Sequence, residues 1–175
     1  MRRTVMRRHD IFMLICSAEF APPDDPLMSE TAREGNEVMQ LTSRQAQAIL
    51  DGGEAKANEL GLPVVVAVLD AGAHLKAFRR MDGAVLASID IAIRKATTAA
   101  LFQANSEAVW EYCKPGAPAQ GLQLTNGGLA TFGGGIPLRS LDGTVIGALG
   151  VSGGAVSQDI EVAQAALGAF ENLIR

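Results

Sequence analysis

The feature that most constrains the fold of this chain is a pair of strand-like segments joined by a very short link. Residues 63–69 form a continuous, mostly β-branched apolar run, and residues 74–81 follow after only Asp70-Ala71-Gly72-Ala73. A continuous apolar run is typical of a central strand that is buried on both faces. Because parallel neighbours need a crossover of a dozen or more residues, the short link predicts an antiparallel hairpin.

Helix-like and strand-like patterns alternate around this hairpin. Apolar residues at helical spacing predict helices over residues 41–60 and 84–102, and a final helix that is capped by Ser157. A second hairpin is predicted over residues 128–138 and 144–152, because an Asp-Gly pair marks a tight turn between them. This order predicts an α+β domain, with a single antiparallel sheet of about five strands flanked by helices.

The composition describes a globular chain with a modest negative charge. Its 175 residues are 48% hydrophobic and 5% aromatic, and the net charge is -4. This length suits one domain with a proper core. The acidic balance and the few aromatic side chains argue against nucleic-acid binding, by phosphate contacts or by base stacking. No apolar run approaches the roughly 20 residues that span a bilayer, so no transmembrane segment is predicted.

The N-terminal part differs from the rest of the sequence. Four arginines among the first eight residues precede a short apolar run at residues 11–18. This pattern resembles a truncated secretory signal, and the alternative is a translation start further downstream. We predict that residues 1–38 are a disordered or signal-like extension and that residues 39–175 form the folded domain. The predicted location is cytoplasmic, or secreted or periplasmic if residues 1–21 act as a signal peptide.

His74 opens the second strand of the first predicted hairpin, four residues after Asp70. Apart from His9, it is the only histidine in the chain. An imidazole in this place can serve as a haem or metal ligand, or as a general base near neutral pH. The alternative is a histidine at a strand end that makes only local hydrogen bonds.

Lys95 lies in the middle of the predicted helix over residues 84–102, which is apolar almost all round. A buried lysine needs a partner or a lowered pKa, and this makes Lys95 a candidate site residue. The alternative is that Arg94 and Lys95 mark a narrow solvent-exposed face. Two glycine-rich segments, residues 133–135 and 147–154, offer backbone amides to an anion, with turns and close packing as the alternative explanation.

Four segments together resemble the GlcG/HbpS family, and they occur in the family's order: VAVLDAGAHLKAFRRMDGA, SIDIAIRKATTAALF, TFGGGIPLRSLDGTVIGALGVSGG and QDIEVAQAAL. They also resemble the C-terminal domain of PduO-type corrinoid adenosyltransferases. The likeness runs from about Leu41 to Ile174. It implies a profilin-like fold with a five-stranded antiparallel sheet and a homo-oligomer, octamers being typical. It also implies haem binding, for storage or redox sensing rather than turnover.

The resemblance transfers only partly to the site residues. In the PduO-type domain the axial histidine lies in the first helix, and residues 41–60 of this chain contain no histidine. His74 then becomes the candidate ligand of the haem iron, with Asp70, Lys95 and Thr98 as further candidate binding residues. Family members that use weak oxygen ligands would bring four threonines into play, namely Thr97, Thr98, Thr125 and Thr131.

Three functions fit these observations. The first is an oligomeric haem-binding protein with His74 as the ligand. The second is an enzyme or binder of a small molecule in a catabolic operon, in which Asp70, His74, Lys95 and the glycine-rich loops take an anionic organic acid. The third is an assembly module without a ligand, because one fold can serve many roles.

Overall fold

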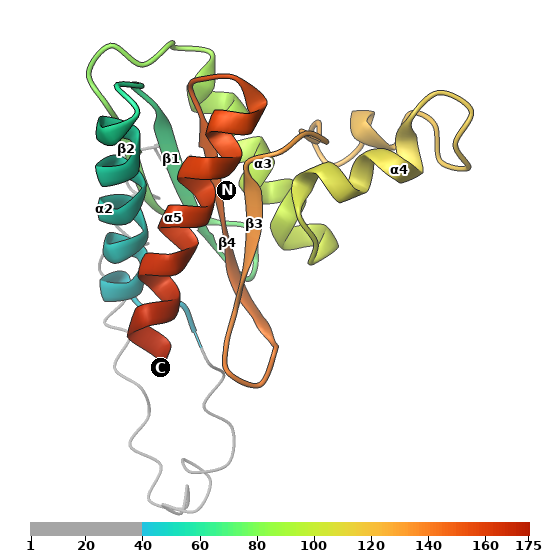
Figure 1. Cartoon of the computed structure of the whole chain (residues 1–175). Helices are drawn as coiled ribbons and strands as arrows, with labels where there is room; N and C mark the ends of the chain where they lie inside the picture. Colours follow the sequence, from blue (N-terminus) through green and yellow to red (C-terminus); the bar gives the residue numbers. More distant parts are fainter. Residues whose placement is uncertain (1–39) are drawn as a thin grey trace, which may run out of the picture. The chain divides into compact units, whose positions relative to one another are not determined.

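The computed structural model describes residues 40–175, so the predicted extension over residues 1–38 lies outside the described part. Its elements follow one another in the order predicted from the sequence (Figure 1). They are α2 (Ser43–Glu59), β1 (Val65–Asp70), β2 (Leu75–Arg80), α3 (Ser88–Phe102), the short helices η2 (Ser106–Val109), α4 (Trp110–Cys113) and η3 (Leu122–Leu124), β3 (Gly135–Arg139), β4 (Val145–Ser152) and α5 (Val156–Ile174).

The four strands form one antiparallel sheet in the order β2-β1-β4-β3. Both predicted hairpins are present, β1 with β2 and β3 with β4. Pairing of β1 with β4 joins the two hairpins and places β1 in the interior of the sheet. The antiparallel α+β architecture predicted from the short links is therefore confirmed.

The prediction of about five strands is wrong for residues 40–175, which form four. The predicted strand over residues 128–138 begins only at Gly135. Gly128 and Gly134 have φ angles of +101° and +110°, which lie outside the extended region of a strand. The carbonyl of Gly128 also accepts a hydrogen bond from the Arg94 side chain at 2.8 Å instead of joining a ladder.

One face of the sheet is covered by α2 and α5, which lie side by side (Figure 1). Val66 and Val68 of β1 pack there against Ile49 of α2 and Phe170 of α5. The helices approach closely at Gly52, where an added Cβ would lie 2.6 Å from the Cβ of Ala169. This contact explains why a glycine is retained inside a helix at a cost of roughly 1 kcal/mol.

The opposite face of the sheet is covered by α3. Val65 and Ala67 of β1 point to this side and pack with Ala92, Ile89 and Ile93. Alternate residues of β1 are therefore buried against different helices, which accounts for its continuous apolar run.

The helices α2 and α5 begin in different ways. At α2 the Gln45 amide N–H donates to Thr42 Oγ1 at 3.2 Å, and the Thr42 N–H donates to Gln45 Oε1 at 2.8 Å. This is a capping box. The prediction that Ser157 caps the final helix is wrong, because α5 already begins at Val156. There the Ala155 N–H donates to Gln158 Oε1 at 3.0 Å.

Between α3 and β3 the chain forms an arm over residues 106–129, which contains η2, α4 and η3 and extends away from the sheet (Figure 1). Within residues 40–175 no helix combines the length and the apolar character needed to cross a membrane.

Candidate functional site

The turn between β1 and β2 is built around the carboxylate of Asp70. Its Oδ1 accepts hydrogen bonds from the backbone N–H groups of Gly72 and His74, both at 2.9 Å. Ala73 adopts a left-handed φ of +60° and donates its N–H to the Asp70 carbonyl at 3.0 Å. The N–H of His74 holds the pKa of Asp70 below its ordinary value, with a smaller contribution from Gly72. Asp70 is therefore an ionised anchor of this turn.

His74 presents its imidazole to solvent beside that anchor. The side chain is 83% exposed, and its Nδ1 lies 3.4 Å from Asp70 Oδ1. Gly72 makes room for the ring, because an added Cβ would lie 2.8 Å from His74 Nδ1. A carboxylate at Nδ1 orients an imidazole and makes it a better ligand at Nε2. No side chain or carbonyl of residues 40–175 hydrogen-bonds to Nε2, so that atom faces no competitor within the described part.

Lys95 is fully buried and belongs to a different cluster. Its Nζ donates to Asp159 Oδ2 at 2.6 Å and to the Val151 carbonyl at 2.8 Å. It also lies 4.9 Å from the centroid of the Phe132 ring. Burial lowers the pKa of Lys95, and the Asp159 carboxylate opposes that shift. The alternative that Lys95 marks a solvent-exposed face is wrong, and only its neighbour Arg94 is partly exposed.

Asp159 connects this lysine to the glycine-rich segment that ends β4. Its Oδ1 accepts the N–H groups of Gly153 and Gly154, each at 3.0 Å. The amides that could have bound an anionic ligand there are therefore satisfied by a carboxylate of the chain itself.

Thr98 has a packing role in this structure. It is fully buried, and its Oγ1 donates to the Arg94 carbonyl at 2.8 Å and accepts from the Ala130 N–H at 3.1 Å. Thr97 and Thr125 likewise donate to backbone carbonyls. Thr131 differs from these three, because it lines a cavity.

The predicted site residues form two groups and not one. In the β1–β4 register Val66 pairs with Val151, and Asp70 pairs with Gly147. Four residues at about 3.3 Å each separate these positions by ~13 Å along the sheet. Asp70 and His74 therefore lie at one end of β1, whereas Lys95 binds the Val151 carbonyl near the other end. A pocket that joins Asp70, His74 and Lys95 around one small ligand is not present in the described part of this chain.

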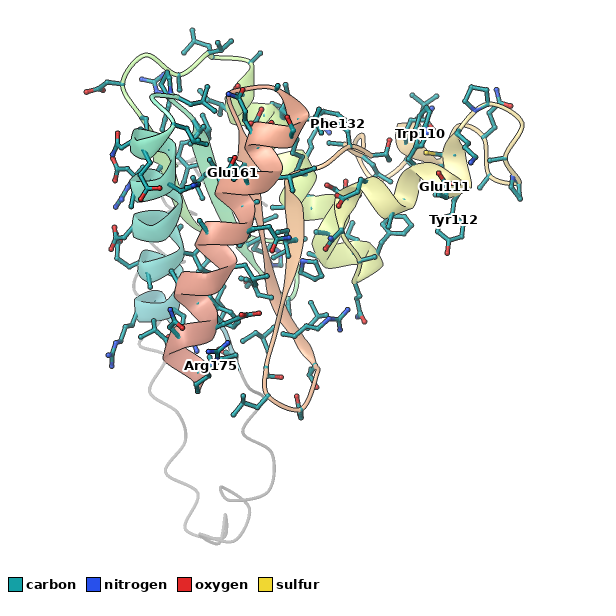
Figure 2. The ribbon with its side chains drawn as sticks, in the orientation of Figure 1. Trp110, Glu111, Tyr112, Phe132, Glu161 and Arg175 are labelled. Atoms are coloured by element: carbon teal, nitrogen blue, oxygen red, sulfur yellow. The ribbon has the colours of Figure 1, made fainter. Side chains whose placement is uncertain are left out.

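A cavity of about 410 Å³ lies between the arm, the loop before β3 and the start of α5. It is lined by Glu107, Trp110, Thr131, Phe132, Gly133 and Val156. Figure 2 shows Trp110 on the arm and Phe132 close to the start of α5. Both aromatic side chains are partly exposed, Trp110 by 43% and Phe132 by 42%. Sequence reasoning missed this cavity, and the only signal available was the single tryptophan of the chain.

A second hollow of about 520 Å³ lies between β3 and the C-terminal half of α5, lined mainly by apolar side chains with Arg139 and Arg175 among them. His74 lines neither hollow. No group of three or more His, Cys, Asp or Glu side chains within residues 40–175 is arranged to hold a metal ion.

The fold and its two covered sheet faces define an antiparallel α+β class, and comparison with known proteins identifies the family within it. The family model described as "Haem degrading protein HbpS-like" matches residues 41–168. An uncharacterised 15.0 kDa protein of Citrobacter freundii, from a dhaT-dhaS intergenic region, is 40% identical over 141 residues, which are 80% of this chain and 99% of that protein. The chain therefore belongs to the HbpS-like family, as its sequence segments predicted.

Two further relatives connect this family to haem and to corrinoid enzymes. The corrinoid adenosyltransferase PduO of Salmonella typhimurium is 35% identical over 150 residues, which are 85% of this chain and 42% of that protein. The chain thus spans less than half of PduO. The solved structure of a PduOC:heme complex is 35% identical, covers 75% of this chain and 95% of its own, and superposes with a TM-score of 0.71.

Proposed function

We propose that this chain is a haem-binding protein that works as a homo-oligomer, in haem storage or redox sensing rather than in turnover. The observation that carries the proposal is the likeness over residues 41–168 to the HbpS-like family, together with the likeness to a protein solved with haem. We extend the proposal to the family's profilin-like fold, and to residues 39–175 as the domain that carries the function.

We propose His74 as the ligand of the haem iron. Imidazole nitrogen is a common axial ligand of haem. Nε2 of His74 is the atom offered to the iron, because Asp70 lies beside Nδ1 at 3.4 Å. Three residues act together here: His74 binds, Asp70 orients the imidazole, and Gly72 leaves space for the ring. When bound, haem would supply its redox-active iron to this turn.

A second copy of the chain would supply the apolar cover that a porphyrin needs, since His74 is exposed. Phe78 lies opposite Ala67, on the sheet face covered by α3, yet it is partly exposed. Other large apolar side chains near this face are also exposed, namely Leu75, Leu86 and Leu101. We take these four exposed side chains as the candidate interface, because exposed apolar surface typically marks protein–protein contacts.

Sedimentation of the full chain is expected to give a species several times heavier than the 18.3 kDa monomer. Leu101→Glu should shift the chain towards monomer, because a charge in an apolar interface is costly. The control is Leu141→Glu in the β3–β4 turn, another exposed leucine outside this candidate interface. A wild-type chain that sediments as a monomer would contradict the oligomer.

His74→Ala is expected to weaken hemin binding by at least about 10- to 100-fold, because loss of only a group that orients a metal ligand already has an effect of that size. The readout is the Soret band during titration of the full chain, and free imidazole should restore the wild-type band position. Lys76→Ala, at another exposed position of the same hairpin, serves as the matched control.

Thr131 provides the competing assignment, because it lines the aromatic cavity and makes no hydrogen bond within residues 40–175. If His74→Ala leaves the Soret band unchanged and Thr131→Val shifts it, His74 is not the ligand and the cavity holds the haem. The family description also names haem degradation. Slow loss of the Soret band in the same cuvette, with a reductant present, would reveal that reaction.

A further inference from the structure

The cavity beside the arm has a rigid aromatic wall. The Ser106 hydroxyl donates to the Phe132 carbonyl at 2.6 Å and accepts from the Gly135 N–H at 3.0 Å. Ser106 is completely buried, so this link is shielded from water. It fixes the backbone of Phe132 to the first residue of η2, and η2 leads directly into Trp110. Two partly exposed aromatic rings are thus held around one hollow.

One carboxylate at this hollow has no cation within ion-pair distance in the described part of the chain. Glu107 is the only charged residue among those that line the cavity. Lys95 lies behind Phe132 and pairs with Asp159 at 2.6 Å. Burial lowers the pKa of Lys95, and Asp159 and, to a smaller extent, Glu107 oppose that shift. Glu107 makes no salt bridge within residues 40–175 and receives only a 3.3 Å hydrogen bond from Asn105.

Aromatic faces and a carboxylate form an environment that suits an organic cation. A cation is attracted to the electron-rich face of an aromatic ring, most strongly that of tryptophan. Phe132 already shows this behaviour, because the Lys95 ammonium lies 4.9 Å from its centroid. The face of Phe132 turned to Lys95 is occupied, so Trp110 is the principal ring for a ligand, and Glu107 supplies the countercharge.

We propose that this cavity binds a small organic cation, an aryl-alkyl ammonium ion whose positive group lies near Glu107 and the Trp110 ring. The volume of about 410 Å³ is within the range of small-molecule sites. Apolar contact with Phe132 and Val156 would hold the uncharged part of the ligand. The proposal does not depend on haem binding, because it concerns the haem-free chain and different residues from His74.

Trp110 offers a direct readout, since it is the only tryptophan in the chain. Benzyltrimethylammonium titrated into the haem-free full chain at constant ionic strength should change the tryptophan emission saturably. Two control compounds share the benzyl frame: benzyl alcohol is uncharged and phenylacetate is negatively charged. Both are expected to bind at least about tenfold more weakly than benzyltrimethylammonium.

Glu107→Gln should weaken binding of benzyltrimethylammonium by about tenfold while keeping the tryptophan for the readout. The matched control is Glu111→Gln, a neighbouring exposed carboxylate that pairs with Lys114 and does not line the cavity. Unfolding curves of both variants check that each folds as the wild type does. A linear, non-saturating response, equal affinity for the three probes, or a Glu107→Gln variant that binds as well as wild type would each overturn the proposal.

Discussion

Replacing Lys95 by methionine should lower the free energy of unfolding by about 3–5 kcal/mol, because it leaves the Asp159 carboxylate buried without its cation. The ammonium also satisfies the Val151 carbonyl, which would lose its side-chain partner in the variant. Methionine has a similar length and fills the space of the lysine stem. The loss of stability would therefore arise from the missing charge and not from a cavity. Urea denaturation followed by circular dichroism measures it.

The matched control for this experiment is Lys114→Met. Lys114 forms an exposed ion pair with Glu111, and such pairs contribute only about 0–1 kcal/mol. Adding Asp159→Asn to Lys95→Met should restore part of the lost stability, because the asparagine oxygen can still accept from Gly153 and Gly154. A Lys95→Met variant as stable as Lys114→Met would show that Lys95 is not buried in an ion pair.

Gly150→Ala is expected to destabilise the fold by about 3 kcal/mol or to prevent folding altogether. An added Cβ would overlap the Ala92 carbonyl oxygen and lie 2.7 Å from the Ala96 nitrogen. Both atoms belong to the backbone of α3, so the contact can be relieved only by moving the whole helix from the sheet. Overpacking of a close-packed core usually costs about 1–3 kcal/mol, and more where backbone must shift.

Gly168→Ala is the control that separates steric overlap from the general effect of an added methyl group. Gly168 lies inside α5, and a Cβ added there would meet no atom within 4 Å. Alanine should therefore stabilise α5 by about 0.5–1 kcal/mol. Equal effects of the two substitutions would contradict the close approach of α3 to β4.

Much of the fold could be predicted from the sequence because local patterns determine it. The continuous apolar run of β1 reflects burial on both faces, and the two short links fix antiparallel pairing. The strand predicted over residues 128–138 is too long because the glycine-rich segment before Gly135 is not extended: its backbone turns at Gly128 and Gly134. The spacing of apolar residues along the sequence does not indicate whether a glycine has a positive φ angle.

The site could be predicted less completely, because its contacts join residues that are distant in the sequence. Lys95 stands out in the sequence as a cation in an apolar helix, but its partner Asp159 is 64 residues away. Lys95 and Asp70 lie near opposite ends of β1 because of the register in which β1 pairs with β4. No sequence motif indicates that register. The cavity at Trp110 depends on how the arm packs near α5, so only the structure could reveal it.

Hemin titration of the purified full chain tests the proposed haem binding most directly. Binding at His74 predicts a shifted Soret band that saturates with added hemin and that His74→Ala weakens, with imidazole restoring it. A broad, featureless spectrum that grows in proportion to added hemin, the same for the wild type and for His74→Ala, would contradict haem binding by this chain.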